Sequence, residues 1–188
     1  MDYRLFHAIN SFAGQIDGID DTFEVLAAYV PFALIGVLFL LWFWPGGRAE
    51  RTDRQWACIA ATLSASLALL MNQIIGLFWQ RPRPFVDHRA VMLAGHSADG
   101  SFPSDHAAFA FAVGASIYLV NRRVGIVALV AATAMAFARV YIGIHYVSDV
   151  ATGAAIGIAA AVLVQQARPM LMPVVDPALG LLRRGHLA

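Results

Sequence analysis

The chain alternates between long apolar runs and shorter polar stretches. Five runs carry no charged residue, at residues 25–44, 55–79, 107–120, 124–138 and 150–164. The first two are long enough to cross a bilayer as helices, which takes about 20 apolar residues. The other three have 14 or 15 residues, a length that also suits buried helices of soluble proteins. If these helices continue through His106, Arg139 and Asp149, each reaches crossing length with its ionisable residue facing the other helices. We therefore expect an all-α, polytopic membrane helix bundle with about five transmembrane helices.

The segments that flank these runs indicate how the rest of the chain is organised. Apolar residues recur at helical spacing along one side of residues 3–16, which predicts an amphipathic helix lying in the membrane interface. We expect one membrane-embedded domain over residues 1–188, made of this interfacial helix and a turn (1–22), the helix bundle (23–167) and a cytoplasmic tail (168–188). Three prolines in the tail predict a loosely ordered surface segment, and a loop is expected at 45–54.

Composition supports a membrane protein. Hydrophobic residues make up 60% of the 188 residues and charged residues 13%, with a mean hydropathy of +0.66, whereas soluble domains are about one quarter charged. All thirteen basic residues are arginine, so a cation that binds an anionic ligand must be a guanidinium, whose planar fork suits phosphate. The net charge of +1 and the lack of a basic cluster give no indication of nucleic-acid binding. The single cysteine, Cys58, excludes an intramolecular disulfide.

The arginines are distributed unequally between the two ends of the predicted helices. Eight lie in the loop 45–54, the turn 121–123 and the tail, and five lie in the N-terminal segment and near the polar clusters described below. Because cytoplasmic loops are enriched in arginine and lysine, the side with eight should be cytoplasmic. The N-terminus and the polar clusters should then face the outside.

The first polar cluster is the segment 101–106, Ser-Phe-Pro-Ser-Asp-His, which immediately precedes an apolar run. One interpretation is a helix cap, because Ser104 or Asp105 suits the N-cap position and Pro103 suits a helix start. The other is a functional site, because polar groups at membrane depth are expensive and usually functional. Ser104 and the backbone amides of a helix start would supply donors to an anion, and His106 could donate a proton to a departing oxygen.

The second cluster contains Arg139, His145 and Asp149. His145 and Asp149 are four residues apart, so on a helix they would share a face, and the carboxylate could fix the imidazole tautomer and leave the other ring nitrogen as nucleophile or base. A satisfied polar pair in a core is the alternative, and Arg139 favours the functional interpretation because it would favour anion binding. A metal site is less well supported, because no further histidine or acid accompanies the pair and nearby arginines would repel a divalent cation.

The third cluster is Arg81-Pro82-Arg83-Pro84, just beyond the second apolar run. The prolines favour extended backbone, so Arg81 and Arg83 should point in roughly opposite directions and only one of them should enter a site. Interfacial snorkelling of the arginines is the alternative. Together, the three clusters offer a nucleophile, an acid and donors for the oxygens of a phosphoryl group.

These residues resemble a known family. Arg81-Pro82, then Pro103-Ser104-Asp105-His106, then Arg139 with His145 and Asp149 are similar to the three-part signature of the type 2 phosphatidic acid phosphatase superfamily, over about residues 72–150. The resemblance implies a metal-free reaction through a phosphohistidine. It implies that His145 is the nucleophile, Asp149 its orienting group and His106 the general acid, and that Arg81, Ser104 and Arg139 bind the phosphate.

Three positions depart from the superfamily pattern. Ile74 stands where a lysine is usual, Asp105 where glycine is usual and Ala138 where serine is usual. Arg83 could take over the part of the missing lysine, and Asp105 could take part in the site or only cap the helix. The fuller wording of the segments 81–85 and 96–106 is most similar to the bacitracin-resistance type of undecaprenyl-diphosphate phosphatases.

The expected activity is hydrolysis of undecaprenyl diphosphate to undecaprenyl phosphate at the outer face of a bacterial inner membrane, with no cofactor and no metal. Another lipid phosphate, such as phosphatidylglycerophosphate, is the alternative substrate. A non-catalytic lipid-phosphate transporter or binding protein would also use arginines and histidines in a membrane, but it would release no phosphate. The sequence assigns no role to His88, His96 or Asp99.

Overall fold

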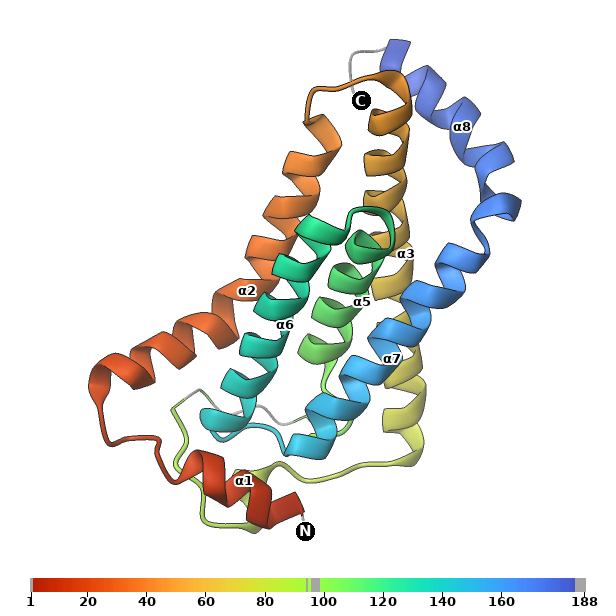
Figure 1. Cartoon of the computed structure of the whole chain (residues 1–188). Helices are drawn as coiled ribbons and strands as arrows, with labels where there is room; N and C mark the ends of the chain where they lie inside the picture. The colour runs from red at the N-terminus through yellow and green to blue at the C-terminus, as the bar shows by residue number, and fades with distance from the viewer. Residues whose placement is uncertain (1, 94, 96–98, 185–188) are drawn as a thin grey trace.

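The computed structural model describes residues 2–93, 95 and 99–184, with the main chain only at 183 and 184. Within these residues the chain forms helices, turns and loops and no strand, so the predicted all-α class is confirmed (Figure 1). The helices are α1 (Asp2–Asn10), α2 (Asp17–Phe43), α3 (Arg48–Phe78), α4 (Pro84–Asp87), α5 (Asp105–Val120), α6 (Arg122–Tyr141), α7 (Val147–Gln166) and α8 (Arg168–Arg184).

The bundle is built from five apolar helices, as the apolar runs predict. Four of them, α2, α3, α6 and α7, are long and apolar enough to cross a membrane, and α5 is a shorter apolar helix. Helix α5 packs against α3, α6 and α7, and its buried side chains are mostly alanines. At 16 residues and about 1.5 Å per residue, α5 is short because it begins at the polar segment that belongs to the site.

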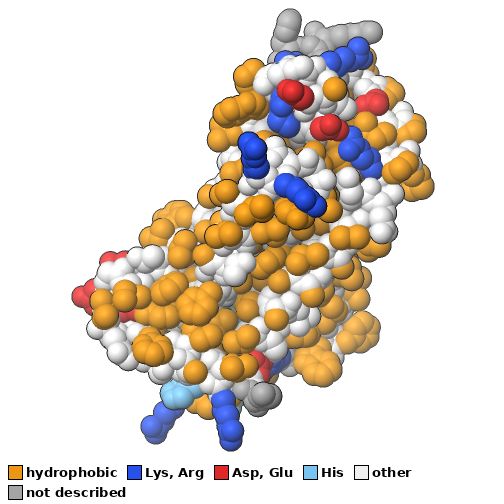
Figure 2. Space-filling model, viewed as in Figure 1, with side chains coloured by type: hydrophobic (Ala, Val, Ile, Leu, Met, Phe, Trp, Pro, Cys, Tyr) orange, Lys and Arg blue, Asp and Glu red, His pale blue; other side chains and the backbone are white. Residues whose placement is uncertain are grey.

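The outside of the bundle is apolar, as a lipid-facing surface requires. Large side chains such as Phe32, Phe39 and Leu77 are more than 60% exposed. On the face shown in Figure 2, hydrophobic side chains cover the middle of the molecule, while the charged side chains gather toward its ends. Because an exposed apolar band of this extent would be unfavourable in water, the protein is a multi-pass membrane protein.

Helices α5 and α7 approach each other closely where both carry small residues. An added Cβ at Gly153 would collide with the carbonyl of Ser104, and one at Gly157 would lie 2.8 Å from the backbone nitrogen of Ala112. Gly153 and Gly157, four residues apart on α7, therefore permit close helix packing. This packing holds the start of α5 against the start of α7.

Two segments expected to lack regular structure are helical. Residues 48–54 were expected in a loop, but they form the first turns of α3, where Arg54 donates to the carbonyl of Trp44 at 2.9 Å. The tail was expected to be loosely ordered, but α8 continues through Pro173 and Pro177. Arg168 pairs with Asp53 at 2.6 Å, and apolar side chains of α8 pack on a cluster around Trp56. Tertiary contacts therefore outweigh the effect of the prolines.

The N-terminal helix is shorter than its apolar pattern predicts. It ends at Asn10 instead of reaching residue 16, and a turn with Gly14 at φ 75° leads into α2, which begins at Asp17. Asn10 explains the end of the helix, because its buried amide donates to the carbonyls of Val91 and Tyr141 at 2.7 Å each. Helix α1 consequently lies across the end of the bundle where α6 leads into α7 (Figure 1).

Candidate active site

The three polar clusters lie at the same end of the bundle, near α1 (Figure 1). Each is carried by the end of a helix: residues 79–83 follow α3, residues 101–106 lead into α5, and residues 139–149 connect α6 with α7. Between them lies a cavity of about 310 Å³. Its lining includes Arg83, His106, Arg139 and His145, together with Asp99 and Asp105.

His145 lies in the loop before α7, two residues ahead of the first helical residue. The expectation that His145 and Asp149 share a helix face is therefore wrong. The Nδ1 atom of His145 is 2.9 Å from the carbonyl oxygen of Ser101. Because a carbonyl can only accept, Nδ1 carries the hydrogen and Nε2 keeps its lone pair. Since His145 lines the cavity, Nε2 is the ring nitrogen available for chemistry.

Asp149 is fully buried and holds the backbone around His145 rather than the ring itself. Its Oδ2 accepts the backbone N–H of Tyr146 at 2.8 Å and the hydroxyl of Ser101, and its Oδ1 accepts from Arg81 at 2.9 Å. The distance from Oδ2 to Nδ1 of His145 is 3.7 Å, too long for a hydrogen bond. Ser101 thus links the two residues, through its carbonyl to His145 and through its hydroxyl to Asp149.

The electrostatic environment keeps His145 neutral. Burial lowers the pKa of His145 below its ordinary value of 6.5, and the charges of Arg139 and Arg83 act in the same direction, opposed by Asp149. A buried imidazole next to cations is disfavoured in its protonated form. His145 is therefore unprotonated near neutral pH, as a nucleophile must be.

Two guanidinium groups supply positive charge to the cavity. Arg83 is 8% exposed, and its Nε and Nη1 donate to the carbonyls of Asp99 and Ile144 at 3.0 and 3.1 Å. These backbone carbonyls position the guanidinium, and the charges of Asp99, Asp149 and Asp105 also act on it. Arg139 lies in the last turn of α6, and its Nε is buried without a partner among the described residues. A buried donor without a partner is costly, and an anion in the cavity would satisfy it.

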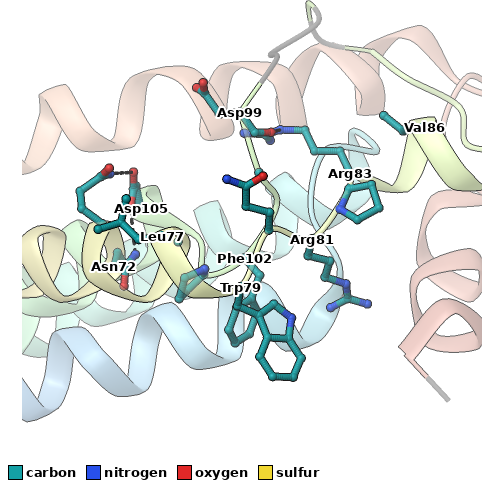
Figure 3. A pocket seen from close by; sticks show the side chains of 15 residues that line it. Asn72, Leu77, Trp79, Arg81, Arg83, Val86, Asp99, Phe102 and Asp105 are labelled. Carbon is teal, nitrogen blue, oxygen red and sulfur yellow. Dashed lines mark hydrogen bonds between the residues drawn. The ribbon is translucent and has the colours of Figure 1, made fainter.

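Arg81 points away from Arg83, as the spacing predicts (Figure 3). Its guanidinium contacts Asp149 at 2.9 Å, Ser148 at 2.7 Å and Asp2 at 2.8 Å. It also lies over the ring of Tyr146, 3.8 Å from the centroid. Of the two arginines, Arg83 lines this cavity, whereas Arg81 pairs with carboxylates and lines a second cavity described below.

The segment 101–106 is both a helix cap and part of the cavity. Ser104 is the N-cap of α5 and accepts the backbone N–H of Ala107 at 3.4 Å, and it is fully buried. Asp105 accepts from Asn72 at 2.9 Å and from Gln73 at 3.3 Å. His106, on the first turn of α5, lines the cavity with Arg139 and His145.

A second, larger cavity of about 810 Å³ adjoins the first one. The two share part of their lining, including Arg83 and Asp105. On its far side the larger cavity is bordered by the last turn of α3, where Leu77 is 76% exposed, and by the rings of Trp79 and Phe102, whose centroids are 6.2 Å apart (Figure 3). The polar cavity therefore opens toward an apolar rim.

Sequence reasoning missed several residues of this network. Ser148 and Asp2 make hydrogen bonds to the predicted site residues, but an isolated serine and an aspartate near the start of the chain carry no pattern that would single them out. Ser101 belongs to the first polar cluster, but its contacts with His145 and Asp149 follow only from the fold. Of the residues left without a role, Asp99 accepts from Arg83 through its carbonyl, and the ring of His88 lies 4.1 Å from that of Tyr3. His96 lies outside the described residues.

The arrangement suits phosphoryl transfer. It combines a neutral imidazole, a second histidine and two arginines in one cavity at the end of a membrane bundle, which provides a nucleophile and charge stabilisation for equatorial phosphate oxygens. Among the residues that the structure describes, no group of three His, Cys, Asp or Glu side chains is placed to hold a metal ion. The fold and the site together define the class of the protein, which is a membrane-embedded phosphatase.

Comparison with known proteins identifies the family. The model of the PAP2 superfamily matches residues 55–173, which include all three polar clusters. The chain belongs to the PAP2 superfamily, and it is a lipid phosphatase of that superfamily.

Individual relatives extend over most of the chain. It is 28% identical to the undecaprenyl-diphosphatase BcrC of Bacillus subtilis (strain 168) over 94% of this chain and 89% of that protein. It is 30% identical to the bacitracin transport permease protein BcrC of Bacillus licheniformis over 88% of this chain and 80% of that protein. The crystal structure of Aquifex aeolicus LpxE shares the fold, with a TM-score of 0.72 and 23% identity over 88% of this chain and 94% of that one.

Proposed function

We propose that this lipid phosphatase hydrolyses undecaprenyl diphosphate to undecaprenyl phosphate and inorganic phosphate. The observation that carries the proposal is the cavity in which His145, His106, Arg83 and Arg139 meet. The similarity to BcrC of Bacillus subtilis, which is named as an undecaprenyl-diphosphatase and matches along nearly the whole chain, supports this substrate.

In the proposed reaction, Nε2 of His145 attacks the terminal phosphorus, and the bond from phosphorus to the bridging oxygen breaks. His106 donates a proton to the departing lipid phosphate. Water then attacks the phosphohistidine, gives a proton back to His106, and releases inorganic phosphate and neutral His145. Arg83 and Arg139 bind the equatorial oxygens, whose charge is best matched by planar, bidentate donors.

The remaining predicted site residues support this centre in the proposal. Asp149 fixes the loop that carries His145, because it accepts from Tyr146 and Ser101. Ser104 caps α5 and thereby orients the backbone amides of its first turn toward the anion. Asp105, held by Asn72 and Gln73, lies in the wall shared by both cavities. Arg81 pairs with Asp149 and also lines the larger cavity, where it is available to the lipid-linked phosphate.

The larger cavity supports a substrate with a lipid tail. It continues from the catalytic cavity past Arg83 to the exposed Leu77 and Trp79. The lipid-linked phosphate and first isoprene units of the substrate would fit this space, and the rest of the chain would pass into the bilayer over the apolar rim. No cofactor or metal takes part in the proposed reaction.

We further propose that the site faces the outside of a bacterial inner membrane, because eight of the thirteen arginines belong to segments at the opposite end. A cysteine introduced at the exposed Gln15 should be labelled by an impermeant reagent in intact cells, and one at the exposed Glu50 only after permeabilisation. The reverse labelling pattern would contradict this orientation.

The function is tested by phosphate release from purified lipids combined with trapping of the intermediate. Wild-type protein should release phosphate from undecaprenyl diphosphate faster than from phosphatidylglycerophosphate, and EDTA should not reduce the rate. Acid-labile, base-stable labelled phosphate should be trapped on the wild type and be absent from His145→Ala. For His106→Ala we expect turnover slowed by roughly 10²–10⁴, the usual contribution of a general acid.

Each outcome addresses a separate part of the proposal. Faster hydrolysis of phosphatidylglycerophosphate would reassign the substrate and leave the reaction type in place. Loss of turnover in EDTA that Mg²⁺ restores would refute the metal-free reaction. Labelled phosphate that persists on His145→Ala would show that another residue is the nucleophile, and binding of lipid phosphate without any release would indicate a transporter or binding protein.

A further inference from the structure

One side chain of α1, Asp2, connects this helix to the residues that hold the proposed catalytic loop in place. Asp2 pairs through Oδ2 with Nη2 of Arg81 at 2.8 Å. Its Oδ1 accepts the backbone N–H of Ser148 at 3.1 Å, and the Ser148 hydroxyl donates to Oδ2. Through Nη1 the same guanidinium of Arg81 donates to Ser148 and to Asp149. Residues from α1, the 79–83 segment and the first turn of α7 thus form one network.

This network surrounds the loop that carries His145. Arg81 covers one face of the Tyr146 ring, and Phe6 of α1 approaches that ring at 5.6 Å between centroids. Phe6 is fully buried. The segment 145–149 is therefore held by its own cap, through Asp149 and Tyr146, and also from outside by α1 and Arg81.

Asp2 also acts as an external cap on α7. The first backbone N–H groups of a helix have no partner within the helix, and a carboxylate near them is stabilising. Ser148 is the second residue of α7, and its N–H is satisfied by Asp2 from a helix 146 residues away in sequence. Burial raises the pKa of Asp2, but hydrogen bonds from Ser148 and Arg81 outweigh it, so the pKa lies below the ordinary 3.8. The carboxylate of Asp2 is therefore ionised at neutral pH.

The attachment of α1 to the bundle does not depend on Asp2. The amide of Asn10 bonds to Val91 and Tyr141, and Phe6 lies in an apolar cluster with Val140 and Tyr146. Loss of the Asp2 carboxylate therefore removes the link to Arg81 and Ser148 while α1 stays in place. The role of Asp2 can be separated from the fold.

We propose that Asp2 is a positioning residue of the phosphatase: together with Arg81 and Ser148 it holds the 145–149 segment so that Nε2 of His145 faces the phosphate. This inference rests on the proposed role of His145 as the nucleophile. The N-terminal helix is then part of the catalytic support and not only an interfacial anchor.

The matched pair Asp2→Asn and Asp21→Asn tests the proposal. Both variants remove one carboxylate from the same end of the molecule, but Asp21 is exposed on α2. We expect Asp2→Asn to lower kcat on the order of tenfold, equivalent to about 1.4 kcal/mol in activation free energy, with KM within twofold of wild type. Asp2→Glu, which keeps the charge, should recover part of the loss, and Asp21→Asn should match wild type.

Ser148→Ala provides a second variant with a conservative change. It removes the hydroxyl between Asp2 and Arg81 but keeps the backbone N–H that Asp2 accepts. If both residues act through the same network, the double variant should lose less than the product of the two single losses. Multiplicative losses, or an Asp2→Asn variant whose kcat equals that of Asp21→Asn, would overturn the proposal.

Hydrogen exchange gives a readout that does not depend on turnover. In Asp2→Asn, amides of the 145–149 segment should exchange faster than in wild type, whereas Asp21→Asn should leave them unchanged. Unchanged exchange in Asp2→Asn would also overturn the proposal. A failure of the nucleophile assignment is detected separately, by labelled phosphate persisting on His145→Ala.

Discussion

The contact between α5 and α7 determines how far His106 lies from His145, so widening it should slow the reaction. A Cβ added at Gly157 would lie 2.8 Å from the backbone nitrogen of Ala112 and closer still to the carbonyl of Ala108. Ordinary contacts begin at 3.4 Å, so the two helices must separate by at least about 0.6 Å. Neither contacting atom can rotate away, because both belong to the backbone of α5.

The size of the effect follows from this displacement. A misplacement of about 1 Å at a catalytic site can lower the rate by about 10²-fold, so a separation of about 0.6 Å should lower kcat by about tenfold or more. Overpacking of this kind costs about 1–3 kcal/mol of stability. Gly157→Ala should therefore lower both the melting temperature and kcat.

The assay compares Gly157→Ala with Gly36→Ala in detergent. Gly36 lies in α2, and a Cβ there would meet no heavy atom within 4 Å, so this control should keep wild-type kcat and melting temperature. Phosphate release gives kcat, and thermal unfolding gives stability. If Gly157→Ala retains both the wild-type kcat and the wild-type melting temperature, the close contact between α5 and α7 at Gly157 does not control the position of the catalytic histidines.

Two further predictions concern charge in the cavity. Because burial lowers the pKa of His145 below 6.5, the acidic limb of the kcat/KM profile, which reports the free enzyme, should have its midpoint below pH 6.5. Folding stability should also fall as the pH drops through this region, since the unfolded chain binds the proton more readily; an acidic midpoint at or above 6.5 would contradict the environment described. Arg83→Lys and Arg139→Lys should each lower kcat/KM by roughly 10²–10³, the usual loss for one transition-state donor, because an ammonium cannot reproduce the guanidinium fork. Wild-type kcat/KM in Arg83→Lys would remove Arg83 from the phosphate site.

The apolar runs predicted the bundle because helix periodicity and span length are local properties of the chain. The runs 124–138 and 150–164 form helices of crossing length once their polar ends are included, as expected, but α5 remains shorter, at 16 residues, even with His106. Segment ends were less predictable. The tail is helical because Arg168 pairs with Asp53, and residues 48–54 are helical because Arg54 donates to the carbonyl of Trp44. Asp53 is far from Arg168 in the sequence and Trp44 lies outside the helix, so helical periodicity does not reveal either contact.

The spacing of Arg81 and Arg83 predicted that they point apart, but not which one lines the smaller cavity with His106 and His145. That choice depends on where Asp2, Ser148 and Asp149 lie, because carboxylates around Arg81 satisfy its charge. Likewise, the four-residue spacing of His145 and Asp149 indicated a shared helix face. The helix begins after His145 instead, because Asp149 uses its carboxylate to cap the Tyr146 amide.

By itself, the sequence determined the class of the protein: an all-α membrane bundle with three polar clusters at helix ends and guanidinium groups as the only basic side chains. Tertiary structure decided which side chains act together. Ser101 and His145 are 44 residues apart and Asp2 and Ser148 are 146 apart, so their contacts exist only after the helices pack. The hydrophobic pattern that predicts a helix can be read from residues close together in the sequence. The orientation of a catalytic side chain depends instead on groups from distant segments, which the packed bundle brings within hydrogen-bonding distance.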